Sequence, residues 1–298
     1  MSDAIEVRAH AKLNVFLRVL GRRSDGYHDV ETLILPLQLH DDVTVGLRTG
    51  AADVAVEVET AVEGVPAPAG PDNLAAAAVR AFAEATGEHR DGVHVRIVKR
   101  IPVAAGMGGG SADAAAVLLA LGQDLGVERE ALSRIAARVG ADVPALLHGG
   151  AVFASGVGEV VTPVHSPTTH WVVKPLGIPV RASDAYAWWD AHGVTGPDTG
   201  AIVAALETGN DELLGSALFD DLQRGVETRH PEVTATVEAL EAAGALGAVM
   251  TGSGPTVVAL ARNLGHADTI AAQVPGAFVT SGPPPAAPRT MGPLSGVV

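Results

Sequence analysis

The densest group of residues suited to chemistry is the run of glycines that follows Pro102. Four glycines stand between Gly106 and Gly110, interrupted only by Met107, and Ser111 comes directly after them. Without side chains, these residues let the backbone approach a bulky anion and direct successive N–H groups toward it. The flanking pattern predicts a strand before the loop and an alanine-rich helix after it, which is the order that phosphate binding at a helix N-terminus requires.

The glycine run matches neither of the two commoner nucleotide-binding motifs. A Walker loop needs lysine after its last glycine, and a dinucleotide fingerprint needs glycine at that place, where this chain has Ser111. A sharp strand-to-helix turn without a ligand is the alternative explanation. Because four glycines cost conformational entropy that a mere turn would not require, phosphate binding is the favoured interpretation.

Two charged residues, Lys12 and Asp142, are candidates that their local sequences leave ambiguous. Asp142 lies in a Gly-Ala-Asp-Val-Pro turn after a predicted helix, from which it could project into a cleft as a base. An aspartate in such a turn more often bonds its own backbone. Lys12 lies in a strand-like stretch, where a solvated face is its usual environment. The residues alone favour the structural explanation for both.

Tyr27 and His28 follow a turn of Asp25 and Gly26. An aromatic ring beside a ring that forms hydrogen bonds can stack on a pyrimidine and recognise its edge. A loop tyrosine that packs on the protein surface is equally compatible with the sequence, so the residues leave both interpretations open.

The composition narrows the class of protein. A chain of 298 residues that is 47% hydrophobic can bury a sizeable core, and the absence of cysteine excludes disulfides, thiolate metal sites and a thiol nucleophile. The net charge of −14 disfavours nucleic acid and anionic membranes as partners. No apolar run approaches the roughly 20 residues of a membrane span, and the N-terminus lacks a signal-peptide pattern, so we expect a cytoplasmic protein. The 11 histidines show no metal-ligand spacing, so we expect no protein metal site.

The hydrophobic pattern predicts mixed strands and helices throughout the chain. The predicted strands are 5–20, 30–39, a hairpin of 43–47 and 54–58 around Gly50, 93–98, one from 151, 171–174, 248–250 and 257–261. The predicted helices are 73–86, 111–121 with Ser111 as its cap, 128–139, 183–192, 200–208, 211–218 and 233–243. Residues 281–298, rich in proline, glycine and alanine, are predicted to be a disordered tail.

Three segments resemble the sequence motifs of the GHMP kinases, the superfamily of galactokinase, homoserine kinase, mevalonate kinase and phosphomevalonate kinase. They are Ala9-His-Ala-Lys-Leu-Asn14, the glycine run from Gly106 to Ser111, and Thr251-Gly-Ser-Gly-Pro-Thr-Val257. His10 departs from the proline that usually opens the first motif. The resemblance implies an α+β, two-lobed fold with the active site in the cleft between the lobes. It implies an N-terminal, ATP-binding and catalytic domain over 1–162 and a C-terminal domain over 163–280.

Further segments resemble the branch of this superfamily that phosphorylates a cytidylated methylerythritol on its 2-hydroxyl, in the non-mevalonate route to isoprenoid precursors. They are Arg23-Ser-Asp-Gly-Tyr-His28, Gly140-Ala-Asp-Val-Pro144, His148-Gly-Gly150 and Gly156-Val-Gly-Glu159. The alternatives are another GHMP kinase of the homoserine or mevalonate type, and a nucleotide-binding protein without transfer activity. Asp25-Gly-Tyr-His28 argues against the first alternative, and the presence of both Lys12 and Asp142 argues against the second.

The resemblance also implies roles for individual residues. Asp142 would accept the proton of the substrate hydroxyl, with Lys12 as the cation that keeps it ionised, and Asn14 would bind substrate or Asp142. Tyr27, His28 and Tyr186 would hold the cytosine. ATP, carrying Mg²⁺, would bind at Lys99, Pro102, Gly106, Gly108, Gly109, Gly110 and Ser111, with Asp113 nearby and ranked below the glycines. The alternative for Lys99 is a strand end in solvent. The oligomeric state stays open, a homodimer being one option.

Overall fold

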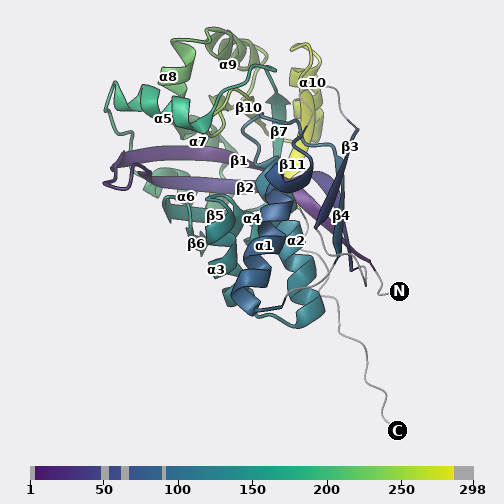
Figure 1. Ribbon diagram of the computed structural model, residues 1–298. Helices are drawn as coiled ribbons and strands as arrows, with labels where there is room; N and C mark the ends of the chain where they lie inside the picture. Colours follow the sequence, from purple (N-terminus) through teal and green to yellow (C-terminus); the bar gives the residue numbers. More distant parts are fainter. Residues whose placement is uncertain (1–3, 48–53, 62–66, 89–91, 285–298) are drawn as a thin grey trace.

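The computed structural model describes residues 4–47, 54–61, 67–88 and 92–284 (Figure 1). Within these residues the chain forms two β-sheets with helices packed around them, which confirms the predicted α+β class. The larger sheet and its helices come mainly from the first half of the chain. The smaller sheet and the remaining helices come from the second half.

The larger sheet is built on a long antiparallel hairpin of β1 (Ile5–Arg22) and β2 (His28–Leu47). The pairing register shifts between His10 and Lys12 and again between Asn14 and Phe16. Bulges re-aim side chains, so the segment from Lys12 to Asn14 is set apart from the regular alternation of the strand. The other strands of this sheet are β3 (Ala55–Thr60), β4 (Val93–Lys99), β5 (Val152–Gly156), β6 (Val160–Pro163) and β8 (Phe219–Asp220).

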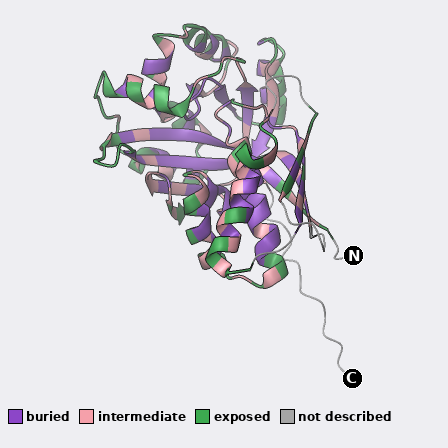
Figure 2. Cartoon of the chain, viewed as in Figure 1, coloured by how far each residue is buried: buried purple, intermediate pink, exposed green. Residues whose placement is uncertain are grey.

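Helices of the first half cover one face of this sheet (Figure 1). Alanines dominate the buried side of α2, and small side chains allow it to approach both α1 and the sheet closely. Figure 2 shows the buried residues along the strands and on the helix faces turned toward them. These elements are a short 3₁₀ turn (Gly70–Asp72), α1 (Leu74–Thr86), α2 (Gly109–Leu125), α3 (Arg129–Val139) and α4 (Val143–His148).

The smaller sheet is antiparallel, with the strand order β11-β7-β10-β9. Its strands are β7 (Thr169–Lys174), β9 (Gly247–Met250), β10 (Val257–Ala261) and β11 (Phe278–Gly282). The helices around it are α5 (Ala182–Asp190), α6 (Gly200–Thr208), α7 (Asp211–Ser216), α8 (Gln223–Glu227), α9 (Glu232–Ala242) and α10 (Leu264–Ala271).

The two halves of the chain are joined by direct packing. Strand β8 pairs in parallel with β1, placing Phe219 opposite Phe16, and β11 packs on β2. Gly282 approaches Pro36 so closely that a Cβ there would overlap the carbonyl of Pro36. One hydrophobic core contains buried side chains from both halves, including Leu13 and Leu260. The two sheets are therefore packed against each other through contacts that both halves of the chain contribute. The domain boundary at residues 162 and 163 stays a proposal.

The predicted hairpin of 43–47 and 54–58 is wrong. Residues 43–47 continue β2, and β4 inserts between β2 and β3, pairing antiparallel with β2 and parallel with β3. Alternate residues of β4 are buried, starting with Val93, Val95 and Ile97, whereas β3 carries exposed acidic side chains. The more apolar strand takes the interior place and the charged strand takes the edge, where charge discourages further pairing. Gly50, at the centre of the predicted turn, lies outside the described residues.

The tail prediction is also corrected at its start. Ser281 and Gly282 are buried and form the end of β11, because they complete the smaller sheet beside β7. The remainder of the predicted tail from residue 285 lies outside the described residues. Several short elements escaped prediction, among them α4, α8 and α10. Within the described ranges, no helix has the length and apolarity that crossing a membrane would take.

Candidate active site

The glycine loop has backbone angles that residues with a side chain adopt with strain. The φ angle is +71° at Gly106 and +69° at Gly108. Helix α2 begins at Gly109, and its N-cap is Gly108, which has no side chain to bond the first amides. The predicted cap at Ser111 is therefore wrong, because the two preceding glycines already belong to the helix. The first amides of a 17-residue helix, together with its positive dipole end, form the donor set that a phosphate group takes.

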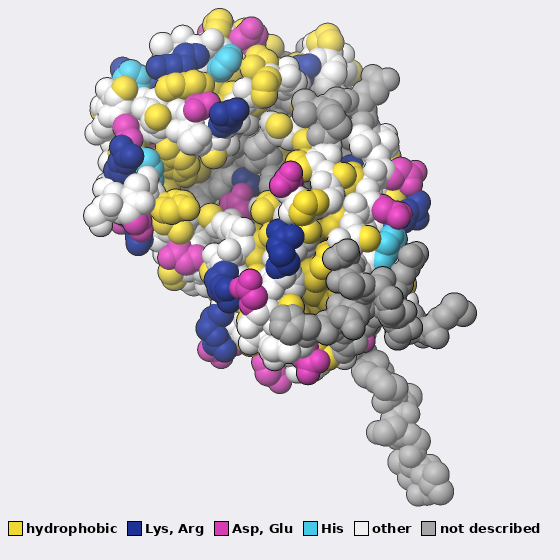
Figure 3. Space-filling model, viewed as in Figure 1, with side chains coloured by type: hydrophobic (Ala, Val, Ile, Leu, Met, Phe, Trp, Pro, Cys, Tyr) yellow, Lys and Arg dark blue, Asp and Glu magenta, His cyan; other side chains and the backbone are white. Residues whose placement is uncertain are grey.

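All the residues that we predicted to bind ATP line one cavity of about 260 Å³. The loop and the start of α2 form one wall, and Pro68, Asn73 and Leu74 at the start of α1 form another. Asn73 is fixed by donating to the carbonyl of Pro68 at 2.7 Å while its oxygen caps the amide of Ala75 at 2.8 Å. Figure 3 shows the viewed face hollowed between the helices of the two halves, with charged side chains inside the hollow.

Lys99 ends β4 inside the protein, so the alternative of a solvated strand end is wrong. Its ammonium contacts Asp41 at 2.5 Å and Asp113 at 2.8 Å, and all three side chains are buried. Although burial alone would lower it, the two carboxylates raise the pKa of Lys99. The Cβ of a residue at 109 would lie 3.2 Å from this ammonium. Lys99 is thus the cation beside the helix start, where it offsets the carboxylate of Asp113.

The two carboxylates of this cluster differ in their partners. Asp41 also accepts from the amides of Arg100 and Ile101, at 2.5 and 2.8 Å. Asp113 Oδ2 accepts from Lys99, whereas its Oδ1 has no hydrogen-bond partner among the described residues. Burial, followed by the charge of Asp41, raises the pKa of Asp113 to about 7. With a pKa of about 7, Asp113 is protonated in much of the folded protein near neutral pH.

We expect Asp113→Asn to flatten the dependence of stability on pH. The folded protein retains a proton on Asp113 up to a pKa of about 7, whereas the unfolded chain releases it near the ordinary value of 3.8. Because the folded state binds more protons in this window, the free energy of unfolding of the wild type falls as the pH rises from about 4 to about 7. The amide cannot titrate, so the variant should lose less stability over that range. Denaturant unfolding at a series of pH values measures the effect, with the exposed Asp268→Asn as control; equal slopes for Asp113→Asn and wild type would contradict it.

Lys12 and Asp142 meet beside the glycine loop. The Lys12 ammonium lies 3.5 Å from Asp142 Oδ2, and the lysine side chain is 5% exposed while that of Asp142 is 35% exposed. The backbone amide of Lys12 donates to the carbonyl of Met107 at 3.0 Å. A Cβ at Gly108 would lie only 2.9 Å from the Lys12 side chain. The carboxylate that we predicted to act on a hydroxyl therefore lies next to the cation and the loop that we predicted to act with it.

Asp142 precedes α4 as its N-cap residue, but its side chain does not cap the helix. The expectation that a turn aspartate bonds its own backbone is therefore wrong here. The carboxylate is turned toward Lys12 and is partly open to solvent.

The third glycine segment, residues 251–257, closes the site from the second half of the chain. Thr251 Oγ1 accepts from the backbone amide of Asn14 at 2.8 Å, and the Asn14 side chain accepts from the Lys12 ammonium. The side-chain amide of Asn14 donates in turn to Thr32 at 2.8 Å. A Cβ at Gly106 would lie 2.7 Å from the carbonyl oxygen of Thr251. All three segments that we singled out in the sequence therefore touch one another in space.

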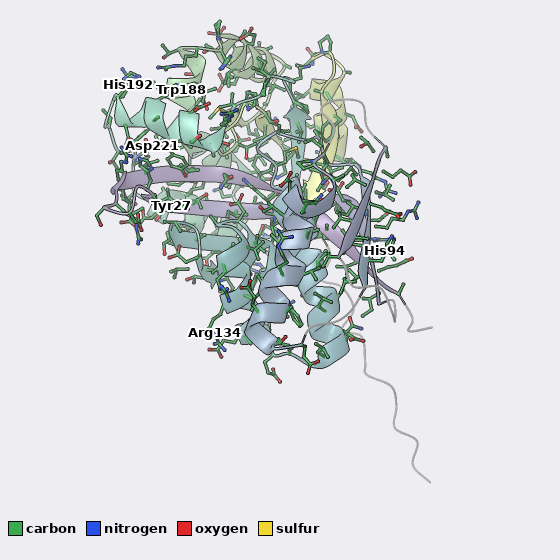
Figure 4. The ribbon with its side chains drawn as sticks, in the orientation of Figure 1. Tyr27, His94, Arg134, Trp188, His192 and Asp221 are labelled. Carbon is green, nitrogen blue, oxygen red and sulfur yellow. The ribbon has the colours of Figure 1, made fainter. Side chains whose placement is uncertain are left out.

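The residues predicted to bind a pyrimidine lie at the loop end of the β1–β2 hairpin. His28 is buried and stacks on Tyr186, with ring centroids 4.7 Å apart and an interplanar angle of 21°. Tyr27 is 66% exposed, so its ring is available to a ligand. Figure 4 shows Tyr27 beside the β1–β2 hairpin. The ring of Tyr186 thus rests on His28, and the predicted contacts of these rings with a base stay predictions.

Two family models match the chain. The model of the GHMP kinases N terminal domain matches residues 73–150, which include the glycine loop and Asp142. The model of the GHMP kinases C terminal domain matches residues 202–280, which include the third glycine segment.

Relatives with one common name extend the likeness over most of the chain. The 4-diphosphocytidyl-2-C-methyl-D-erythritol kinase of Symbiobacterium thermophilum is 40% identical over 262 residues, covering 85% of this chain and 89% of the relative. That of Anaeromyxobacter dehalogenans is 41% identical over 274 residues, covering 90% and 84%. The chain belongs to this family of GHMP kinases.

Solved structures agree with the fold. A crystal structure of 4-(cytidine 5'-diphospho)-2C-methyl-D-erythritol kinase superposes with a TM-score of 0.78 and 34% identity, covering 94% of this chain and 100% of that one. Homoserine kinase from Cytophaga hutchinsonii superposes with a TM-score of 0.73 at 22% identity, covering 95% of each chain. The second comparison shows a shared fold alone.

Two acidic residues at this site, Asp190 and Asp220, were not predicted from the sequence. Asp190 bonds His28 from the end of α5. Asp220 accepts from the amide of Leu222 at 2.8 Å, and its Oδ2 is buried without a partner in the described part of the chain. Burial raises the pKa of Asp220 well above its ordinary value, and Lys12 opposes that rise. A pair of aspartates between Phe219 and Leu222 was the signal available in the sequence, because an aspartate drawn into the interior by apolar neighbours is uncommon and often functional.

Proposed function

We propose that the protein transfers the γ-phosphoryl group of ATP to the 2-hydroxyl of 4-diphosphocytidyl-2-C-methyl-D-erythritol, a step in the non-mevalonate route to isoprenoid precursors. The proposal depends on one observation above all, the ion pair of Lys12 and Asp142 against the glycine loop. Phosphoryl transfer to an alcohol needs the hydroxyl in line with the phosphate, a group to receive its proton, and balanced charge. In this protein the cleft would align the hydroxyl, Asp142 would receive its proton, and the glycine loop with Lys12 would balance the charge.

In this proposal the triphosphate lies over the residues from Gly106 to Ser111, and the amides at the start of α2 offset its negative charge. Asp142 accepts the proton of the substrate hydroxyl or orients that hydroxyl, and Lys12, paired with Asp142, steadies the attacking oxygen. Asn14 holds the ammonium of Lys12 in place. Because these groups position and neutralise charge, no covalent enzyme intermediate is required.

Magnesium would enter the site with the triphosphate. In the ranges that the structure describes, no three or more His, Cys, Asp or Glu side chains gather in a way that could hold a metal ion. Phosphate oxygens would then supply most of the ligands, and the hydroxyl of Ser111 is a hard oxygen donor at the cavity wall. When bound, the ion would offset charge on the transferring group.

A direct assay tests the activity. Purified protein with ATP and Mg²⁺ should release ADP when given the cytidylated alcohol, and phosphorus NMR should show a new phosphate monoester on the 2-hydroxyl in equal amount. Homoserine and mevalonate serve as competing alcohols. Faster turnover of either would replace the proposed substrate, and ADP release with none of the three would leave a nucleotide-binding protein as the better description.

A further inference from the structure

His28 is held at its Nε2 by the carboxylate of Asp190. The two atoms His28 Nε2 and Asp190 Oδ1 lie 2.7 Å apart, and the histidine side chain is 8% exposed. The His28 ring also stacks on Tyr186. It contacts Trp189 in a T-shaped arrangement, with the ring centroids 5.9 Å apart and an interplanar angle of 90°. Its orientation is therefore fixed before any ligand arrives.

Asp190 is itself held in position. It is the last residue of α5, and its other oxygen, Oδ2, lies 3.6 Å from the guanidinium of Arg22 on β1. Arg22 is the residue of β1 that pairs with His28 across the hairpin. The carboxylate thus connects the end of α5 to both strands at the hairpin end.

The bond from Asp190 decides which nitrogen of His28 carries the proton. An ionised carboxylate only accepts hydrogen bonds, so His28 Nε2 must donate and must carry a hydrogen. In the neutral ring, Nδ1 then has a free lone pair and acts as an acceptor. In the part of the chain that the structure describes, His28 Nδ1 has no hydrogen-bond partner. It is also not one of the fully buried polar atoms without a partner, so a ligand can reach it.

An acceptor at this place distinguishes two pyrimidines. Cytosine carries an amino group at C4 that donates, whereas uracil carries an oxygen there that accepts. His28 Nδ1 would bond the first and oppose the second with two facing lone pairs. A site built to bond a substrate group rejects an analogue without that group far more strongly than a site that senses only shape.

We propose that Asp190 is a positioning residue that selects cytosine over uracil by holding His28 in the Nε2–H tautomer. The inference rests on the proposed function for the presence of a cytidylated substrate. Asp190 does not touch the base, and it acts only through the ring of His28. Removing the carboxylate that orients a metal-binding histidine typically costs about 10- to 100-fold in affinity or activity, and we expect an effect of similar size for Asp190 and His28.

The test compares the cytidylated alcohol with its uridylated analogue. The wild type should prefer the cytidylated substrate in kcat/KM by about 100-fold or more. Asp190→Asn can donate from its amide to Nε2 and so permit the Nδ1–H tautomer; its preference should fall by about tenfold or more. The KM for ATP should be unchanged, and Asp190→Glu should restore part of the preference. Asp184→Asn, on the exposed first turn of the same helix, is the matched control.

An unchanged cytosine-to-uracil ratio in Asp190→Asn would overturn the proposal, as would a wild-type preference for the uridylated substrate. Nitrogen-15 NMR of the histidines in the free protein tests the tautomer without any substrate, using His28→Gln to assign the signal. Wild type at neutral pH should show Nε2–H, and Asp190→Ala should show a mixture. A signal for Nδ1–H, or for the doubly protonated ring, would overturn it. Failure of the kinase assay with an Nε2–H signal would instead point to the proposed function as the error.

Discussion

Asp142→Asn should lower kcat by about 10²- to 10⁴-fold, the range that a general acid or base contributes. The amide has nearly the same shape but cannot accept the hydroxyl proton, and it removes the negative partner that lies 3.5 Å from Lys12. The KM for ATP should change by no more than a few-fold, because Asp142 is not among the residues lining the cavity that we assign to the nucleotide. Steady-state kinetics with both substrates varied separates these effects.

The structure offers a check that the loss is catalytic. Asp142 does not cap α4, and its side chain is 35% exposed. The free energy of unfolding of Asp142→Asn should therefore lie within about 1 kcal/mol of the wild-type value. Lys12→Met should also lower kcat, and the double variant should be little worse than the poorer single variant, because residues that act as a unit show non-additive losses. Normal turnover in Asp142→Asn would refute the role of base, and additive losses would refute the pairing.

Gly106→Ala should raise the KM for ATP by about tenfold or more and lower the melting temperature. Position 106 has a φ of +71°, which costs about 1–2 kcal/mol for a residue with a Cβ. The added Cβ would also lie 2.7 Å from the carbonyl oxygen of Thr251 and 3.1 Å from that of Gly254. Backbone cannot move aside cheaply, so the glycine loop must shift away from the third glycine segment and carry the phosphate site with it.

A substitution at a second glycine distinguishes the effect of backbone strain from the effect of displacing the glycine loop. Gly126, at the end of α2, has a similar φ of +65° with no atom near the position of a Cβ. Gly126→Ala should therefore lose a comparable amount of stability from backbone strain alone while its KM for ATP stays at the wild-type value. Equal KM values in the two variants would show that the contact between the two glycine segments does not shape the nucleotide site.

The position of the glycine loop was predictable because its signal is local. A glycine run between a strand and a helix predicts an anion site through backbone geometry alone, and the structure places Gly106 and Gly108 in the left-handed region beside a cavity. Helix α6 and strand β10 begin and end where the hydrophobic pattern predicted. Lys12 and Asp142 needed the resemblance to the GHMP kinases, since 130 positions separate them and neither is distinctive in its own segment.

What failed depends on contacts between distant segments. Alternation predicts that 54–58 is a strand, but only the competition with β4 decides its partner. The burial of Lys99 requires Asp41 and Asp113 to converge on it, and no local pattern reports that. Asp190 bonds His28 although 162 positions separate them in the sequence, and the pattern that predicted a helix over 183–192 does not report that contact.

A crystal structure of the protein with a non-hydrolysable ATP analogue and 4-diphosphocytidyl-2-C-methyl-D-erythritol would test the proposed site most directly. We expect the triphosphate against the amides at the start of α2, and the 2-hydroxyl within hydrogen-bond distance of the Asp142 carboxylate and in line with the γ-phosphate. A triphosphate bound elsewhere, or a 2-hydroxyl beyond the reach of Asp142 in the closed complex, would contradict the mechanism.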